Sequence, residues 1–175
     1  STPSDFGYNG GRPSHPDLLD WLASAFQKGG YRMKPIHRLM VNSATYRQAS
    51  SNNAAAIELD ADNRLHWRKS PVRLDAESIR DATLLIAGKL DPEVGGRGYR
   101  DVKHFFFKGS NFYETLEESG SELRRRTIYR FMPRGGRNPF LDTFDCPDPS
   151  STTPNRAATT TPLQSLALMN NAFVF

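Results

Sequence analysis

Proline and glycine interrupt this chain so often that long regular elements cannot form. The 175 residues include 12 prolines and 13 glycines, which fall between short apolar runs. Proline lacks a backbone N–H and glycine favours turns, so each tends to start or stop a neighbouring helix. The sequence therefore predicts several short helices joined by irregular segments.

Four segments show the apolar period of about 3.6 residues that is typical of a helix buried on one face. Their expected starts are Ser14, Pro35, Asp75 and Thr161, which are capping residues or first-turn prolines. The first helix is expected to end at Gly29 and the second near Gln48. On the third helix, we expect Ile79, Ala82 and Ile86 to face inward.

The remaining patterns complete the predicted fold. Residues 104–107 and 127–132 are rich in aromatic or β-branched side chains and are strand candidates. Prolines and Ser/Thr clusters recur through residues 138–161, which we expect to be irregular. The predicted class is mainly α, a single helical domain over residues 1–175 with a small β element and long irregular Pro-rich segments. The last helix is apolar on most sides and, like Trp21 and Trp67, is expected to be buried.

The net charge of +4 is unevenly distributed. Residues 123–137 contain six arginines and no acid, so the rest of the chain has a net charge of −2. These are Arg124, Arg125, Arg126, Arg130, Arg134 and Arg137, and three aspartates follow them, Asp142, Asp145 and Asp148. Because a guanidinium pairs with carboxylates and carbonyls in a fixed geometry, we expect at least two of these arginines to bond to acceptors within the chain.

Two other interpretations of the same residues stay open. Exposed arginines would bind the sulfates of an acidic polysaccharide, or the phosphates of nucleic acid. Nucleic acid is disfavoured, because alternation in residues 127–131 turns Tyr129 and Phe131 toward the core. The aspartates beside Phe140 and Phe144 could also act as the paired carboxylates of a polysaccharide-cleaving enzyme.

Few residues suggest metal, haem or nucleophilic chemistry. The four histidines lie in separate segments, and Cys146 is followed by Pro147 rather than by the rest of a Cys-x-x-Cys-His haem site. The glycine run at 95–98 lacks the Lys-Ser/Thr of a phosphate loop. We therefore predict no cofactor and no metal site in this chain. No apolar run approaches the roughly 18 residues of a membrane span.

Several strings in fixed order carry a family resemblance. They are HPDLLDWLASAF (15–26), HRLMVNSATYRQ (37–48), DNRLHWR (62–68), RLDAESIRDA (73–82), RRTIYRF (125–131), FDCPDPS (144–150) and TTTPLQSLALMNNAFV (159–174). Together they resemble the planctomycete PSD-one domain, a domain of unknown function near the C-terminal end of large secreted proteins. In such proteins it typically follows another domain of unknown function and often a c-type cytochrome domain.

This resemblance implies a setting but no catalytic residues. It implies the C-terminal portion of a larger family domain, truncated at both ends, in an exported protein of the periplasm or the extracellular space. In such a compartment Cys146 is free to pair outside this chain. We predict a non-catalytic structural or interaction module whose partners are other domains of the parent protein. The alternative is a fragment of a polysaccharide-acting enzyme that uses residues 142–148.

Overall fold

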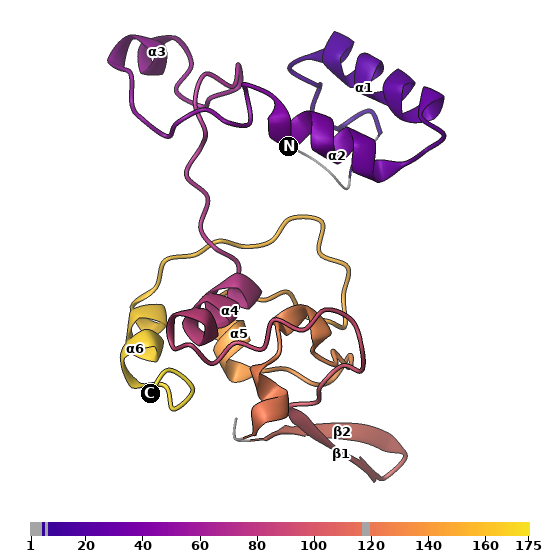
Figure 1. Ribbon diagram of the computed structural model, residues 1–175, viewed down its shortest axis with the longest axis vertical. Helices are drawn as coiled ribbons and strands as arrows, with labels where there is room; N and C mark the ends of the chain where they lie inside the picture. Colours follow the sequence, from indigo (N-terminus) through magenta and orange to yellow (C-terminus); the bar gives the residue numbers. More distant parts are fainter. Residues whose placement is uncertain (1–4, 6, 117–119) are drawn as a thin grey trace. The chain divides into compact units, whose positions relative to one another are not determined.

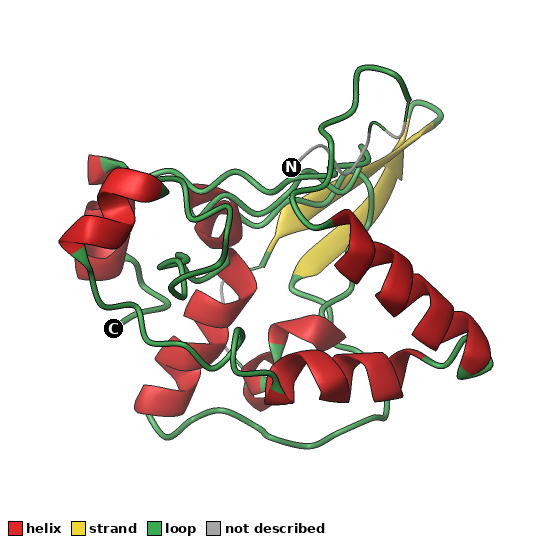
Figure 2. Cartoon of the chain, turned by 90° about the horizontal axis from the view of Figure 1, so that it is seen from above, coloured by secondary structure: helices red, strands yellow, loops and turns green. Residues whose placement is uncertain are grey.

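The computed structural model describes residues 5, 7–116 and 120–175. Two compact units, Ser1–Val72 and Arg73–Phe175, are called unit 1 and unit 2 and are described separately (Figure 1). Short helices, an antiparallel strand pair and long loops make up the described residues (Figure 2). The predicted mainly α class is wrong, because 37% of the structure is helical and 10% belongs to the sheet. The fold is mixed, and side-chain bonds to the backbone order much of the irregular remainder.

Unit 1 begins with two helices, α1 (Pro16–Lys28) and α2 (Met33–Asn42). Gly29 ends α1 as predicted, and its N–H donates to the carbonyl of Ala25 at 2.9 Å. The predicted Ser14 cap is wrong: His15 occupies the cap position without a capping bond, because the Ser14 hydroxyl pairs with the His15 ring. Helix α2 stops six residues before Gln48.

The rest of unit 1 is one short helix and a tightly bonded turn. Helix α3 (Ala54–Leu59) was not predicted, and the Asn53 side chain caps it by accepting from the Ala56 N–H at 3.2 Å. In the following turn the Asp60 carboxylate accepts from two backbone N–H groups. The Trp67 indole donates to the Asp60 carbonyl at 2.9 Å and is half-buried. Trp21, by contrast, is 54% exposed, so its predicted burial is wrong.

Unit 2 begins with α4 (Ala76–Ile86), which Asp75 caps as predicted by accepting from the Ser78 N–H at 3.0 Å. Its buried residues are Ala76, Arg80 and Leu84, spaced four apart. Ile79 and Ala82 are partly buried, but Ile86 is 87% exposed, so its predicted inward position is wrong. The inner face of this helix has a charged residue at its centre.

A β-hairpin follows, formed by β1 (Val102–Phe107) and β2 (Ser110–Thr115). Their pairing is antiparallel, with Phe105 opposite Phe112, and the strands are the yellow pair in Figure 2. The predicted strand at 104–107 is confirmed. Its partner was missed, because β2 begins with Ser110 and Asn111 and lacks an apolar run. The connecting Lys108 and Gly109 both have positive φ, as two-residue hairpin turns require.

The second predicted strand, 127–132, is wrong. Residues Thr127–Tyr129 form a short 3-10 helix, η2, preceded by another, η1 (Ser121–Arg124). The Thr127 N–H donates to the Asp81 carboxylate at 2.7 Å, and its hydroxyl donates to the same oxygen at 2.6 Å. Because the side chains of α4 take these polar groups, the segment does not pair as a strand. An isolated bridge between Tyr99 and Arg130 is the one β-type contact it makes within the described residues.

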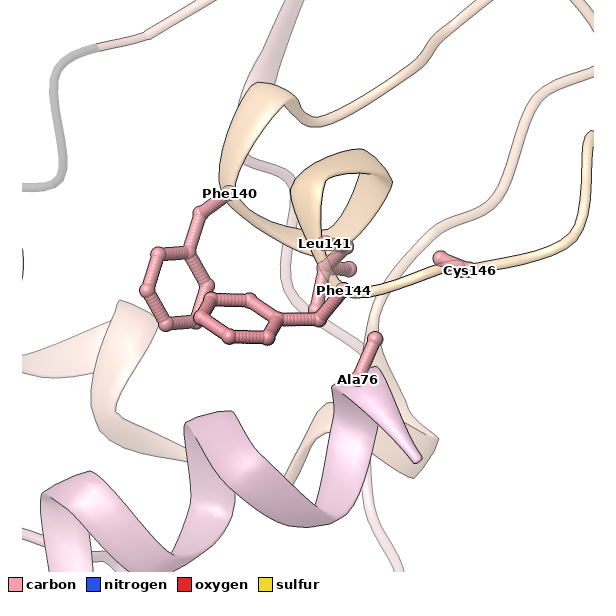
Figure 3. Close-up of a cluster of buried hydrophobic side chains, with 5 residues drawn as sticks. All are labelled: Ala76, Phe140, Leu141, Phe144 and Cys146. Carbon is pink, nitrogen blue, oxygen red and sulfur yellow. The ribbon is translucent and has the colours of Figure 1, made fainter. Parts of the chain in front are cut away.

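The apolar core of unit 2 surrounds α5 (Pro139–Thr143). Figure 3 shows the cluster, in which the rings of Phe140 and Phe144 lie 5.0 Å apart. The cluster consists of Ala76, Phe140, Leu141, Phe144 and Cys146. The Cys146 thiol is therefore enclosed by the core of its own unit.

The last helix, α6 (Pro162–Asn170), has the predicted start. The Gln164 N–H donates to the Thr161 hydroxyl at 3.3 Å, and the Thr161 N–H donates to the Gln164 side chain at 3.1 Å, which completes a capping box. Its predicted burial is wrong, because Gln164 is its one buried residue and Leu163, Leu166 and Met169 are exposed.

We expect Thr161→Ala to lower the free energy of unfolding by about 1 kcal/mol, because the first turn of α6 loses its cap. Urea unfolding followed by circular dichroism measures the change. Thr152→Ala, an exposed threonine in the irregular segment before α6, is the control and should be neutral. Equal stability of the two variants would contradict the cap's contribution.

Candidate functional site: an arginine cluster in unit 2

A buried arginine that sequence reasoning overlooked lies at the centre of unit 2. Arg80 of α4 is 1% exposed. Its guanidinium donates to the carbonyls of Leu123 and Arg125, the latter at 3.2 Å. The same group lies 5.3 Å from the ring centre of Tyr99 and 5.2 Å from that of Phe173. Arg80 thus connects the helix, the arginine-rich segment and the C-terminal residues.

Arg125 holds the glycine-rich loop. Its guanidinium donates to the carbonyls of Glu93, Gly95 and Arg97. The group also lies 4.1 Å from the ring centre of Tyr129, whose hydroxyl accepts from the Gly95 N–H at 2.7 Å. The loop carbonyls are therefore already bound by an internal cation.

Arg130 forms a buried ion pair with Asp101. The Arg130 Nε lies 2.7 Å from the carboxylate, and both side chains are 2% exposed. The Asn138 side chain donates to the same carboxylate oxygen at 2.8 Å and also caps α5. Asp101, which directly precedes β1, is thus bound both to Arg130 and to the residue that caps α5.

Arg137 contacts two of the predicted aspartates. Its Nε donates to Asp142 at 2.9 Å, and its Nη1 approaches Asp148 at 3.5 Å. A hydrogen bond to Asp142 raises the pKa of Arg137. Bonds from the Ser150 hydroxyl and backbone, the main causes, lower the pKa of Asp148. Arg124, Arg126 and Arg134 are exposed, although Arg126 lies 3.7 Å from Asp81.

Asp145 binds residues at and just before the start of α6, whereas Asp142 and Asp148 contact Arg137. Its carboxylate accepts from the Thr159 N–H at 2.7 Å, from the Thr159 hydroxyl at 2.9 Å and from the Gln164 amide at 3.4 Å. The backbone bond from Thr159 is the main cause that lowers the pKa of Asp145. Asp145 thereby ties the segment before α6 to the end of α5.

These contacts bear on what the cluster can do chemically. A glycosidase needs one carboxyl that keeps its proton at neutral pH, which requires a raised pKa. The pKa values of Asp145 and Asp148 are instead lowered, and Asp142 and Asp148 share one arginine. Among the described residues, no three His, Cys, Asp or Glu side chains form a metal-binding group. The arrangement suits anchoring of backbone rather than proton transfer.

The sequence carried one signal for the missed residue. Arg80 stands four residues after Ala76 and four before Leu84, so it shares their face of the helix. Asp81 and Asp101 gave no local signal, because their partners lie 46 and 29 residues away.

The family model for a protein of unknown function (DUF1553) matches residues 1–175, so the chain belongs to that family. No curated protein and no solved structure matches the chain. Within the described ranges, no helix is both long and apolar enough to cross a bilayer.

We expect Asp101→Ala to destabilise unit 2 by about 3–5 kcal/mol, because it leaves the Arg130 charge buried without its partner. Arg130→Met in the same background should restore part of that loss, since it removes the unpaired charge. A double-mutant cycle by urea unfolding measures the coupling. Additive effects of the two substitutions would contradict the pairing.

The Cys146 thiol should make stability fall at alkaline pH. Burial is the main cause that raises its pKa to about 11, from 9.0 when unperturbed. The folded protein keeps the thiol proton between these values whereas the unfolded chain releases it, so stability is full below pH 9 and decreases as the pH rises toward 11. Comparing Cys146→Ser with the parent chain by urea unfolding at several pH values isolates this contribution, because serine does not ionise there. Identical pH dependence of the two proteins would contradict it.

Proposed function

We propose that this chain is a non-catalytic interaction module of a large exported multidomain protein that contains a c-type cytochrome domain. The proposed setting, periplasmic or extracellular, rests on the resemblance described above. The partners are other domains of the parent protein, and the chain itself needs no cofactor.

The observation that carries the proposal is the apolar surface of unit 1. Neither α1 nor α2 has a buried residue. Large apolar side chains are instead exposed on both, among them Leu18, Trp21, Leu39 and Met40. A helix normally buries its apolar stripe against another element. These two helices therefore suit contact with a further protein surface.

The use of the carboxylates supports the non-catalytic part. Asp142, Asp145 and Asp148 all accept hydrogen bonds from within unit 2. The alternative, a polysaccharide-acting enzyme, has no comparable observation in its favour. An acidic or sulfated polysaccharide as a ligand of the exposed Arg124, Arg126 and Arg134 stays a prediction.

Amide hydrogen exchange tests the proposal. It is measured on the 175-residue chain alone and on the native protein isolated from its source cells. If the native protein covers unit 1, amides of α1 and α2 should exchange at least about tenfold more slowly there than in the chain alone. Amides of α4, whose inner face is already buried, serve as the internal control. Equal exchange in α1 and α2 would contradict the interaction role.

A further inference from the structure

Unit 1 contains an open groove of about 1020 Å³ lined by α1, α2 and the turns that follow them. Most of its floor is apolar, and the apolar lining includes Leu18, Trp21, Leu39, Met40 and Tyr46. Each of these side chains is more than 40% exposed. The groove therefore offers apolar surface that nothing within the described part of unit 1 covers.

The charges around the groove have one sign. Arg38, Arg68 and Lys69 line it, and no aspartate or glutamate does. Within the described residues, none of these three side chains forms an ion pair with a carboxylate. Unit 1 as a whole has nine Lys or Arg against six Asp or Glu. Charge complementarity therefore selects an occupant that is apolar on one side and acidic at its edges.

The basic side of the groove is held in place by backbone bonds. Asn63, in a left-handed conformation, donates to the Arg68 carbonyl at 2.7 Å and accepts from the Arg68 N–H at 3.2 Å. The Lys69 N–H donates to the Ala49 carbonyl at 3.0 Å. The Arg68 guanidinium also bonds to the Asn52 side chain. Because these bonds exist before any ligand arrives, binding loses less conformational entropy.

We propose that the groove binds an amphipathic helix of a partner protein, with acidic residues flanking its apolar face. This inference rests on the proposed interaction role and names the partner's chemistry. Two neighbouring helices with an apolar groove receive a third through side chains spaced at i, i+3, i+4 and i+7. A helix about 10 Å wide that rises 1.5 Å per residue would fill this volume with roughly two to three turns.

Other occupants fit the groove less well. A second copy of the chain brings the same basic surface, and like charges would repel. A bilayer is flat on this scale and does not enter a concave groove. Small ligands usually occupy pockets that enclose most of their surface, whereas this groove is open to solvent.

Isothermal titration calorimetry on the full chain tests the proposal with two synthetic peptides of about 14 residues, close to four helical turns. Both carry leucine at i, i+3, i+4 and i+7, and one has glutamate and the other lysine at the remaining positions. We expect the glutamate peptide to bind at least about tenfold more tightly than the lysine peptide. Raising the salt from about 50 to 200 mM should weaken its binding.

Matched variants locate the site. Arg38→Gln with Lys69→Gln should weaken binding of the glutamate peptide about tenfold, since two favourable charge contacts are lost. Lys34→Gln with Arg47→Gln removes the same charge from exposed positions outside the groove, and should change the affinity less than about twofold. Circular dichroism confirms that both variants remain folded.

Several results would overturn the helix proposal. The proposal fails if the two peptides bind equally, or if the two variant pairs weaken binding equally. It also fails if dodecanoate or phosphatidylglycerol vesicles bind while the glutamate peptide does not. The last such result is self-association of the chain that the Arg38 and Lys69 substitutions abolish. If the peptide fails while α1 and α2 are protected in the native protein, the interaction role stands and the helix partner is wrong. If the exchange rates are also equal, both are wrong.

Discussion

The burial of one guanidinium, that of Arg80, is the constraint on which the rest of unit 2 depends. Taking a cation out of water is unfavourable unless hydrogen-bond acceptors replace the water around it. Carbonyls of residues 123 and 125 supply these acceptors, so their segment must turn its backbone toward α4. A regular strand or α-helix would commit the same carbonyls to its own bonds. The irregular course of this segment is therefore a consequence of the charge on the inner face of α4.

Arginines of the arginine-rich segment also bind acceptors within unit 2. Arg125 satisfies the loop carbonyls before the hairpin, and Arg130 pairs with Asp101 at its base. In this segment, side-chain hydrogen bonds take the place of the backbone–backbone hydrogen bonds of regular helices and sheets. Buried polar groups therefore find partners even though the chain has little regular structure. A pair this deeply buried adds little net stability, because desolvation offsets the attraction between the charges.

Unit 1 differs from unit 2 because it leaves the apolar faces of α1 and α2 exposed. In unit 2 the aspartates Asp142, Asp145 and Asp148 and several arginines are bonded internally, and an apolar cluster forms around α5. In unit 1 the turn at residues 60–70 is internally bonded, but the apolar faces of α1 and α2 remain open beside a set of cations. This contrast is the basis on which we propose a contact role for unit 1, within a family whose function is unknown.

Three signals that act within four residues were readable from the sequence alone. Gly29 ends α1, Asp75 caps α4 and the Thr161 capping box starts α6, because each depends only on groups in the same turn. The burial of Arg80, the exposure of Ile86 and the 3-10 form of Thr127–Tyr129 depended instead on tertiary contacts. Thr127 bonds to a residue 46 positions away, and that bond overrides the strand propensity of its own segment. Local hydrogen bonds thus determined where α1 ends and where α4 and α6 begin, whereas tertiary contacts with distant charged groups decided which faces are buried.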